Sequence, residues 1–485
     1  MTVIARPRPA IVAVDLGASN CRVSLLRWIE GKPCFSLVHR FPNAPVQKGD
    51  TLCWDIDAIF SGIVEGLRRC AVLAPEGIAS IAADGWAVDY VRLGPDGLPL
   101  AAPFCYRDTR NIAAEEAVHT LIASERLYEI TGAQRLRFNT IYQLYADRMA
   151  GLTSAPWLNL PEYVLYRLGG RCVAEYTNAT HTGLIDLKTK SWSEEIFQSL
   201  GFDLRHAPKL VSPGTDIGRL QGPLTLLPAF RDTRLIAPAC HDTASAIAGI
   251  PRHDDDWAYI SSGTWSLIGT VLNSACNTPQ ALAENFTNLG AAGGRICFHK
   301  SINGMWLIQQ CMEHWAEQGT SWPLSDLLQQ AENLEKPKAL LDLNDENLLL
   351  PGNMPSRIHA QLTRRGLKAI PETPEGAPAV ANLIFHSLAA RYTDALQGLQ
   401  KLTGKTFREL CVVGGGSRNY LINRYTQEAS GLKVSSGHVE SSTIGNFAIQ
   451  LALANAVAGA NRSPSAREIA QWAEELASTI CEERV

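Results

Sequence analysis

The chain has 485 residues, of which 46% are apolar and 19% are charged, enough to bury a sizeable core and to form about two to four domains. Lys and Arg number 44 against 48 Asp and Glu, and the resulting net charge of −4 excludes a basic surface for nucleic acid or an anionic membrane. No run approaches the roughly 18 uncharged apolar residues of a membrane helix. The first apolar run is interrupted at Asp15, so we expect a soluble chain without a leader peptide.

The first predicted element is a hairpin. Residues 11–26 contain two apolar, β-branched runs around a short Gly/Ser/Asn stretch, which is typical of strand, tight turn and strand. A segment of the same shape recurs at 259–271, and the charged stretch 252–257 lies between them like an inter-lobe connection. We therefore predict a duplicated architecture with two lobes, residues 1–250 and residues 255–485.

Further along the chain, strands alternate with helices. Residues 78–84 and 235–239 are predicted to be short buried strands, and each is followed by polar residues. Residues 378–402 place their apolar side chains on one helical face, and Gly404 ends the pattern. This alternation indicates an α/β fold with mixed sheets.

Twelve cysteines are scattered from Cys21 to Cys481, without a C-x-x-C pair or a Cys/His cluster at zinc spacing. We expect most of them to be buried thiols in a reducing cytoplasm. The histidines, including His181 and His299, form no recognisable ligand set, and we assign them no metal role.

The turn of the first hairpin has the residues of a phosphate site. Gly17 permits a tight turn, while Ser19, Asn20 and nearby amides can line a concavity for phosphate oxygens. Asp15, at the end of a buried strand, can hold Mg²⁺ through water. An ordinary hairpin with a polar tip explains the same residues, so the turn alone leaves both interpretations open.

Two later turns strengthen the nucleotide interpretation. Residues 261–264 offer hydroxyl and amide donors on a turn of the same kind, and one turn from each lobe would grip a triphosphate. Residues 411–413 form an apolar run that meets three glycines, 414–416, before a helix expected near Asn419. Glycines there permit close approach of a base or ribose. Each turn is weak by itself, but three of them after buried strands indicate a nucleotide site.

His241, Asp242 and Thr243 follow a predicted strand and precede the small-residue run 244–249. Asp242 suits a helix N-cap. It also suits a general base that takes a proton from a substrate hydroxyl during phosphoryl transfer. Spacing alone favours the cap.

Two polar-aromatic segments suit a sugar. Asp84, Trp86 and Asp89 lie at one strand end, where carboxylates can take hydroxyls and an indole can cover an apolar sugar face. A core tryptophan with loop-capping carboxylates fits equally well. Arg107 and Asp108 either bind substrate or pair with each other in a solvated loop.

Taken together, these stretches resemble the FGGY family of carbohydrate kinases, and within it most closely the members that act on L-rhamnulose. The family has the two-lobed actin, hexokinase and Hsp70-like ATPase fold, built from duplicated ribonuclease H-like domains. The resemblance covers about residues 10–455. The stretches that carry it are residues 14–19, 86–89, 106–108, 138–144, 175–180, 241–245, 261–266 and 413–416.

The resemblance implies transfer of the ATP γ-phosphate to the 1-hydroxyl of L-rhamnulose, with Mg²⁺ and with ATP between the lobes. It makes Asp242 the proton acceptor, which reverses the preference for a cap. The nucleotide-side positions are Asp15, which also serves the metal, Gly17, Ala18, Ser19, Asn20, Cys21, Arg22, Gly263, Thr264, Gln309, Gly415 and Gly416. The substrate-side positions are Asp84, Trp86, Ala87, Asp89, Arg107, His241, Thr243 and Ser301.

Three departures from the family pattern bear on the sugar. Ala87 replaces a glycine, Ser301 replaces an asparagine, and Asn20-Cys21 replaces Ser-Gly. A methyl group or a lost hydrogen bond shifts selectivity by roughly 1–3 kcal/mol, so a related ketose such as L-fuculose or L-xylulose is the alternative substrate. A non-catalytic actin-like nucleotide-binding protein is the alternative from another class. We expect a cytoplasmic monomer or homodimer whose partner is a small-molecule ketose, not nucleic acid or a membrane.

Overall fold

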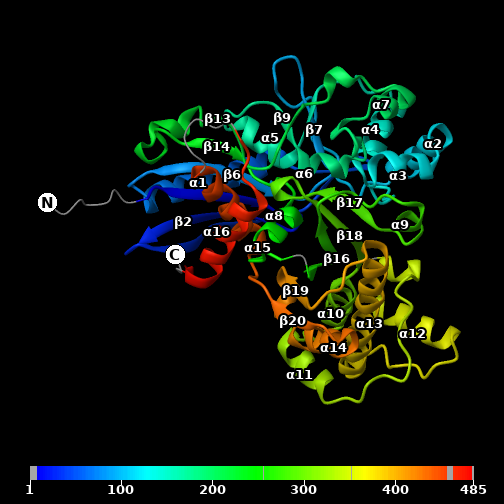
Figure 1. The fold of residues 1–485 in the computed structure, drawn as a ribbon. Coiled ribbons are helices and arrows are strands. Elements are labelled where there is room, and N and C mark those ends of the chain that lie inside the picture. The colour runs from blue at the N-terminus through cyan, green and yellow to red at the C-terminus, as the bar shows by residue number, and fades with distance from the viewer. Residues whose placement is uncertain (1–7, 255, 351, 456–461, 483–485) are drawn as a thin grey trace. The chain divides into compact units, whose positions relative to one another are not determined.

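The computed structural model describes residues 8–254, 256–350, 352–455 and 462–482 (Figure 1). Among these residues, the first compact unit comprises the chain up to His253, the segment Val271–Phe298 and the chain from Glu440 onward. The second unit comprises Asp254–Thr270 and His299–Val439. The chain therefore first crosses between units in the charged stretch 252–257, and it returns to the first unit twice. A single boundary between residues 250 and 255 stays a prediction.

The first unit is built on a seven-stranded sheet. Its strands, in spatial order, are β13 (Thr215–Arg219), β14 (Arg234–Ala237), β6 (Ile78–Gly85), β1 (Ala10–Leu16), β2 (Asn20–Ile29), β3 (Lys32–Pro42) and β21 (Cys481–Glu482). β1 pairs antiparallel with β2 and parallel with β6, and β6 pairs parallel with β14. The parallel strands therefore bring the ends of β1, β6 and β14 to one edge of the sheet.

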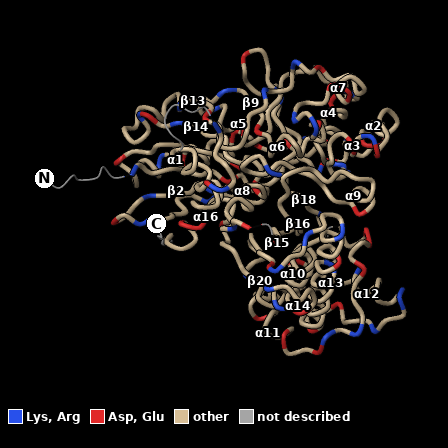
Figure 2. Tube along the Cα trace, in the orientation of Figure 1, with Lys and Arg blue, Asp and Glu red and all other residues tan. Residues whose placement is uncertain are grey.

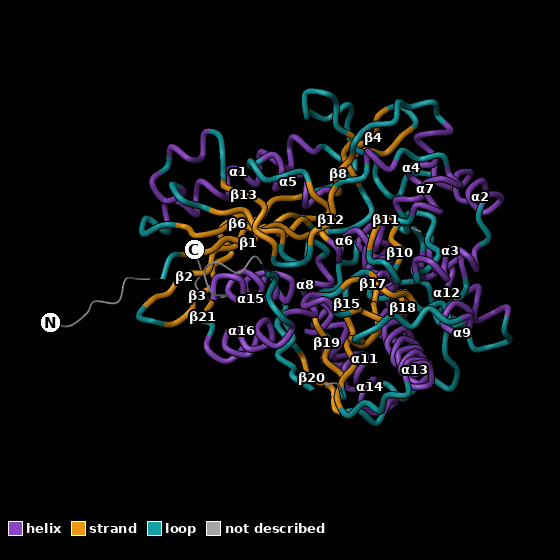
Figure 3. The backbone as a smooth tube through the Cα atoms, turned by 45° about the horizontal axis from the view of Figure 1, so that its top comes forward, coloured by secondary structure: helices purple, strands orange, loops and turns teal. Residues whose placement is uncertain are grey.

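Both faces of this sheet are covered by helices (Figure 3). Val12 and Val14 of β1 pack in one core with Ile63 of α1 (Ile56–Leu73). The alternate residue Ala13 packs in another core with Phe447 of α15 (Ser441–Asn455). Because successive side chains of a strand point to opposite faces, a strand buried on both sides is apolar throughout. This explains the unbroken apolar run before Asp15.

Helix α1 shows how the sequence specifies a helix that packs on one face of the sheet. Asp55 precedes it as the N-cap, and its Oδ1 accepts a hydrogen bond of 3.0 Å from the backbone N–H of Ala58. The buried residues Ile56, Ile59, Ile63 and others recur at helical spacing.

The rest of the first unit consists of short helices and two-stranded sheets. The helices are α2 (Asn111–Leu121), α3 (Ser124–Thr131), α4 (Thr140–Met149), α5 (Leu160–Arg167), α6 (Tyr176–Ala179), α7 (Glu194–Leu200), α8 (Asp242–Ala248), α9 (Pro279–Ala283) and α16 (Ala466–Thr479). The paired strands are β4 (Val46–Lys48) with β5 (Thr51–Cys53), β7 (Tyr90–Arg92) with β8 (Trp157–Asn159), β9 (Val173–Glu175) with β12 (Lys209–Val211), and β10 (Ile185–Asp186) with β11 (Ser191–Trp192). β17 (Thr287–Gly290) also lies in a segment of this unit.

The second unit repeats the central pattern. β15 (Trp257–Ser262) pairs antiparallel with β16 (Trp265–Leu272) and parallel with β19 (Glu409–Val413), which pairs parallel with β20 (Lys433–Ser436). β18 (Ile296–Asn303) follows β16 in the sheet order. The helices are α10 (Trp306–Glu317), α11 (Leu324–Glu332), α12 (Met354–Arg364), α13 (Ala377–Thr403) and α14 (Tyr420–Ser430).

The structure confirms the main elements expected from the sequence. Both hairpins are present, residues 78–84 lie in β6, and the helix expected at 378–402 is α13, which ends at a left-handed Gly404. Eight of the ten free cysteines that the structure describes are buried, and Cys34 is disulfide-bonded. Acidic and basic residues are interspersed along the trace (Figure 2). Within the described ranges, no helix has the length and apolarity to span a bilayer.

Candidate active site

The turn between β1 and β2 depends on a glycine. A Cβ added to Gly17 would lie 2.3 Å from the backbone oxygen of Asn20, so no other residue fits this turn. The Gly17 carbonyl accepts a hydrogen bond of 3.0 Å from Asn43 Nδ2. Ala18 is half-buried and Ser19 is exposed at the tip. The hydroxyl and the nearby amides are therefore accessible, as a phosphate site requires.

The two residues that follow the tip face other protein groups. Cys21 is fully buried, and its thiol lies 3.8 Å from the Gly17 carbonyl. Burial, together with the negative charge of Asp15, raises the pKa of Cys21 to about 12. The Asn20 side chain accepts a hydrogen bond of 3.0 Å from Arg40 Nε. The buried Cys21 thiol is thus not available to a nucleotide, and a nucleotide contact through the backbone at this position stays a prediction.

Asp15 ends β1 in a buried ion pair. Its Oδ2 accepts hydrogen bonds of 2.7 Å from Arg22 and 3.2 Å from Ser442 Oγ. Arg22 stands opposite Asp15 in the strand register, and its guanidinium also lies 3.5 Å from Glu440. Burial opposes the charge on Arg22, but the two carboxylates raise its pKa further. The turn therefore carries one fixed cation beside two acids.

Asp84 lies next to this pair. It is fully buried and stands beside Asp15 in the parallel register of β1 and β6. Its Oδ2 accepts a hydrogen bond of 2.6 Å from Asn446 Nδ2, while its buried Oδ1 has no hydrogen-bond partner among the described residues. Burial, then the charges of Asp15 and Asp242, raise the pKa of Asp84 well above its ordinary value. The site thus holds an excess of acidic groups.

Backbone hydrogen bonds connect the end of β6 to a segment on each of its two sides. The backbone N–H of Gly85 donates to Cys240 at 3.0 Å, and that of Trp86 donates to Leu16 at 3.1 Å. A Cβ on Gly85 would lie 2.5 Å from the Leu16 Cβ, so glycine permits this close approach. These bonds join the first turn to the segment that leads into Asp242.

The chain after Trp86 adopts a strained conformation. Val88 has φ of +74°, a left-handed conformation that is costly for a β-branched residue. Its carbonyl accepts hydrogen bonds of 2.7 Å from Thr140 Oγ1 and 3.2 Å from Gln143 Nε2. Such strain persists only where the surroundings hold it, and it clusters at functional sites. Here the left-handed conformation of Val88 determines the direction of the backbone next to Ala87.

Asp89 holds an aromatic pair. Its carboxylate accepts hydrogen bonds from Trp54 Nε1 at 2.6 Å, Trp86 Nε1 at 3.0 Å, Gln143 Nε2 at 3.0 Å and the Tyr106 N–H at 3.2 Å. The Trp54 and Trp86 ring centroids are 4.6 Å apart. Asp89 is fully buried, and burial raises its pKa to about 6. With three donors on Oδ2 and one on Oδ1, the Asp89 carboxylate orients the two indoles, and its direct contact with a sugar stays a prediction.

Arg107 and Asp108 do not pair. Asp108 is buried and accepts hydrogen bonds from the backbone N–H groups of Leu52 at 2.6 Å and Arg110 at 2.8 Å. Arg107 is exposed, and its Nε donates to Tyr106 Oη at 3.0 Å. The ion-pair alternative is therefore wrong, and Arg107 remains accessible to a ligand.

Asp242 is the first residue of α8, and His241 occupies the N-cap position without a side-chain cap bond. The N-cap expectation for Asp242 is therefore wrong. Its Oδ1 accepts hydrogen bonds from the backbone N–H and from the hydroxyl of Thr243, the latter at 3.1 Å, and lies 3.3 Å from His241 Nε2. In the part of the chain that the structure describes, no hydrogen bond involves Oδ2. One carboxylate oxygen is thus held while the other is open.

The pKa of the Asp242 carboxyl is raised. The surrounding protein, then the negative charge of Asp15, raise its pKa from 3.8 to about 7. Its side chain still keeps 38% of its surface exposed, so a substrate hydroxyl can reach it. A general base works best with a pKa near the working pH.

In the second unit, the turn after β15 is tied to the start of α10. The Gly263 carbonyl accepts a hydrogen bond of 3.0 Å from the Met305 N–H, and the Thr264 carbonyl accepts one of 3.2 Å from the Trp306 N–H. Gln309 lies exposed on α10, one helical turn further on. Ser301 is half-buried on β18.

The glycine turn after β19 packs beside the same hairpin. A Cβ on Gly416 would lie 2.0 Å from Ser262 Oγ, and Gly414 has φ of +81° with its added Cβ 2.8 Å from the Ser262 oxygen. An added Cβ on Gly415 would meet nothing within 4 Å. Gly414 and Gly416 therefore permit close packing, while Gly415 presents open backbone.

Comparison with known proteins identifies the family. Two family models match the chain, the N-terminal domain of the FGGY family of carbohydrate kinases at residues 10–249 and its C-terminal domain at residues 258–454. The chain belongs to the FGGY family of carbohydrate kinases. It is 36% identical over 442 residues to a rhamnulokinase of Bacteroides thetaiotaomicron, covering 90% of this chain and 89% of that protein. It is 38% identical over 451 residues to a rhamnulokinase of Enterococcus faecalis, covering 91% and 88%.

Solved structures confirm the predicted fold class of this carbohydrate kinase. A ligand-bound xylulose kinase from Lactobacillus acidophilus aligns with a TM-score of 0.76 at 17% identity, over 96% of each chain. A glycerol kinase from Plasmodium falciparum with ADP aligns with a TM-score of 0.71 at 14% identity, over 98% of this chain and 94% of that one. The kinase therefore has the two-domain α/β fold of the actin and hexokinase-like ATPases.

Several residues of the kinase site escape sequence reasoning. Trp54 faces Trp86, and Glu440, Ser442 and Asn446 reach the acidic cluster from α15 or the residue before it. The small-residue run 244–249 was the available signal, because it marks a helix that another backbone approaches closely. A Cβ on Gly249 would lie 2.7 Å from the Ser441 carbonyl oxygen.

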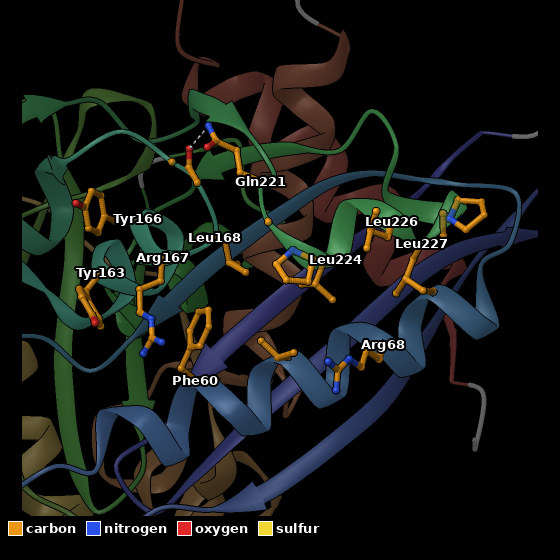
Figure 4. Close-up of a pocket in the computed structure, with 18 of the residues that line it drawn as sticks. Phe60, Arg68, Tyr163, Tyr166, Arg167, Leu168, Gln221, Leu224, Leu226 and Leu227 are labelled. Carbon is orange, nitrogen blue, oxygen red and sulfur yellow. Dashed lines mark hydrogen bonds between the residues drawn. The ribbon is translucent and has the colours of Figure 1, made fainter. Parts of the chain in front are cut away.

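The first unit of the kinase also contains a cavity of about 1270 Å³ away from these groups (Figure 4). It lies between α1, α5 and the 3₁₀ turns Pro223–Leu226 and Pro228–Phe230, and its walls include Phe60, Tyr163 and Leu224. Its described lining contains none of Asp15, Asp84 and Asp242. This cavity and the acidic cluster are therefore separate features of the first unit.

Proposed function

We propose that this carbohydrate kinase transfers the γ-phosphate of ATP to the 1-hydroxyl of L-rhamnulose, giving L-rhamnulose 1-phosphate and ADP. The observation that carries the proposal is Asp242, with one oxygen held by Thr243 and the other open. The sugar is supported by relatives named rhamnulokinase that share 36–38% identity across about nine-tenths of the chain.

The proposed reaction begins with Asp242 ionised. Its open Oδ2 takes the proton of the sugar hydroxyl as that oxygen forms a bond to the γ-phosphorus. The bond from the γ-phosphorus to the β,γ-bridging oxygen breaks, and ADP keeps that electron pair. The proton on Asp242 is then released to solvent. Holding Oδ1 with protein donors fixes which oxygen receives the proton.

Arg22 and the first turn are proposed to take the phosphates. Arg22 supplies a fixed positive charge, and Ala18 and Ser19 place accessible groups at the turn. A positioned cation stabilises the charge that spreads over the transferring phosphoryl oxygens.

The acidic cluster fits a magnesium ion. Asp15 and Asp84 are neighbours in the register, and a buried Asp84 oxygen has no described partner. Burial and then the charge of Asp15 raise the pKa of Asp84, and a bound cation would relieve the repulsion between the two carboxylates. No cluster of three or more His, Cys, Asp or Glu side chains at metal-binding distances occurs among the described residues, so Asp15 and Asp84 would hold Mg²⁺ together with water and phosphate oxygens. When bound, the ion would neutralise charge on the β- and γ-phosphates.

The sugar is proposed to contact the edge formed by Trp86, Ala87 and His241, with Thr243, Arg107 and Ser301 as further contacts. The Asp89 carboxylate and the Trp54 ring fix the Trp86 indole, which suits packing against an apolar sugar face. In the second unit, Gly263, Thr264, Gln309, Gly415 and Gly416 are proposed to bind the nucleotide. The open backbone at Gly415 supports close approach of a flat group.

A related ketose, L-fuculose or L-xylulose, is the second candidate substrate. Ala87 favours it, because its methyl group lies where the backbone is strained and closely packed. A cytoplasmic location and a monomeric or homodimeric state stay predictions from the sequence.

A ketose panel tests the proposed function. Purified protein, ATP and Mg²⁺ are assayed with L-rhamnulose, L-fuculose, L-xylulose and D-xylulose for ADP release. We expect the highest kcat/KM with L-rhamnulose. A higher value with another ketose replaces the substrate, and ATP binding without sugar-stimulated ADP release with any ketose contradicts the proposed reaction.

A further inference from the structure

The segment 175–182 contacts the loop that leads into Asp242. Glu175, fully buried, accepts a hydrogen bond of 2.8 Å from the Cys240 N–H. Thr177 Oγ1 accepts a longer one of 3.4 Å from the His241 N–H. Glu175 also accepts from the Thr177 N–H at 2.8 Å, so the two acceptors are fixed to each other. This segment holds the backbone of the loop.

His181 adds a side-chain contact to these backbone bonds. It lies on the 3₁₀ turn Thr180–Thr182, and its Nε2 is within hydrogen-bond distance, 3.0 Å, of His241 Nδ1. The two ring centroids are 3.8 Å apart. His181 is half-buried, whereas His241 keeps only 7% of its surface exposed. Two imidazolium cations at this separation would repel each other strongly, so the pair holds at most one extra proton.

The direction of this hydrogen bond fixes the state of His241. A neutral imidazole has one N–H and one bare nitrogen. If His181 Nε2 donates, then His241 Nδ1 is bare and its proton is on Nε2. His241 Nε2 lies 3.3 Å from Asp242 Oδ1, so in this tautomer the protonated nitrogen is the one next to the held oxygen of the proposed catalytic carboxylate. In the opposite tautomer, His241 Nε2 carries no proton, and its lone pair would face a lone pair of Asp242 Oδ1.

We propose that His181 is a positioning residue, which holds His241 as the Nε2–H tautomer and thereby keeps Asp242 Oδ2 open to the sugar hydroxyl. The idea rests on the proposed function, since it gives Asp242 the role of base. A ring's partner at one nitrogen decides which nitrogen carries the proton and how the ring is oriented. His181 therefore acts on the reaction through His241 without touching substrate.

The first experiment compares two substitutions at His181. His181→Leu removes the donor, and we expect kcat to fall about 10- to 100-fold with the KM for ATP unchanged, because the base is misplaced rather than the nucleotide. His181→Gln places an amide N–H near the lost Nε2–H and should stay within about threefold of the parent. The control is His119→Leu, which removes the 2.9 Å contact between His119 and Tyr142 and should keep full kcat. Equal losses in His181→Leu and His181→Gln overturn the proposal.

The second experiment tests whether His181 acts through His241. In a His241→Gln background, His181→Leu should lower kcat no further, whereas an independent loss of the same size contradicts the proposal. Nitrogen-15 NMR of labelled histidine gives a readout that does not need turnover. His241 should be the Nε2–H tautomer in the parent and in His181→Gln. A parent spectrum with the proton on Nδ1 overturns the idea even if the ketose panel succeeds. If the panel fails, the Nε2–H tautomer supports only the positioning of His241 by His181, so the two failures can be told apart.

Discussion

The two hairpins occupy corresponding places in their sheets and present different chemistry. Each consists of two antiparallel strands with a third strand parallel to the first, β6 beside β1 and β19 beside β15. Where the first hairpin sets Asp15 opposite Arg22 and beside Asp84, the second sets Ser262 opposite Ser266. One arrangement of the backbone therefore carries a charged turn in one unit and a neutral turn in the other.

We expect this difference to separate two tasks. Charges fixed in a buried site act strongly on a transition state in which charge is redistributed. We expect the neutral hydroxyls and amides of the second turn to bind the ground and transition states about equally, and such binding changes KM more than kcat. We therefore expect substitutions in the first unit to slow the reaction and substitutions in the second to weaken nucleotide binding.

The largest effect is expected from Asp242→Asn. Loss of a general base lowers kcat by about 10²- to 10⁴-fold, while the amide preserves the side-chain shape and leaves ATP binding intact. Steady-state ADP release and calorimetric ATP binding measure the two quantities. Asp203→Asn, which changes a loop carboxylate paired with Arg205, serves as the control. A fully active Asp242→Asn enzyme would show that Asp242 of the first unit is not the general base.

Arg22→Gln and Thr264→Val compare the two turns directly. Loss of the Arg22 cation should lower kcat about 10- to 100-fold, because charge-assisted bonds to phosphate are strong and Asp15 is left unpaired. Thr264→Val should raise the KM for ATP about fivefold, the value of one ordinary hydrogen bond, with kcat nearly unchanged. Initial rates over a matrix of ATP and sugar concentrations give both constants. If Thr264→Val instead reduces kcat as much as Arg22→Gln does, the division of tasks fails.

The pH dependence should come from the first unit. Asp242 accepts a proton only when ionised, and its pKa is raised to about 7. The kcat/KM for the sugar should therefore fall about tenfold for each pH unit below that value and level off above it. Thr264→Val should keep the same profile, since it alters no ionisable group. A profile that stays level for about two pH units below 7 would show that another group limits the reaction.

The smallest effects concern stability, and they test whether close packing requires a glycine at the corresponding turns of both units. Gly85→Ala and Gly414→Ala should each lower the free energy of unfolding by about 1–3 kcal/mol, because the added Cβ would lie 2.5 Å from Leu16 and 2.8 Å from Ser262. Gly415→Ala is the matched control, with nothing within 4 Å of its Cβ, and should leave stability unchanged. Urea denaturation measures all three. Equal stability of Gly414→Ala and Gly415→Ala would show that the glycine turn after β19 rearranges to accommodate a Cβ at residue 414.

Local patterns predicted the hairpins, because strand alternation and Gly-containing turns are properties of neighbouring residues. The same reasoning could not show that Asp89 is taken up by two indoles, since Trp54 and Trp86 are far apart in sequence. It also missed Asn446, whose bond to Asp84 joins residues separated by 362 positions.

The roles of side chains, like the elements, were only partly predictable from the sequence. The resemblance predicts that Asp242 is the base, which stays a proposal, whereas spacing favoured an N-cap that the helix start at Asp242 excludes. The sequence did not show that Cys21 and Asp89 are buried against protein partners, because a polar residue near a site can point inward wherever it finds a hydrogen-bond partner. His181 carried no sequence signal, since a lone histidine is informative only beside its partner.

The bond between Asn446 and Asp84 also has a consequence for the nascent chain. During synthesis, β1, β6 and the segment of Asp242 leave the ribosome long before α15 does, so the acidic residues exist first without Asn446 or Ser442. The close approach of Gly249 to Ser441 means that α15 then docks directly on the helix that begins with Asp242. A growing chain therefore holds these acidic residues without their two hydrogen-bond partners until α15 has emerged.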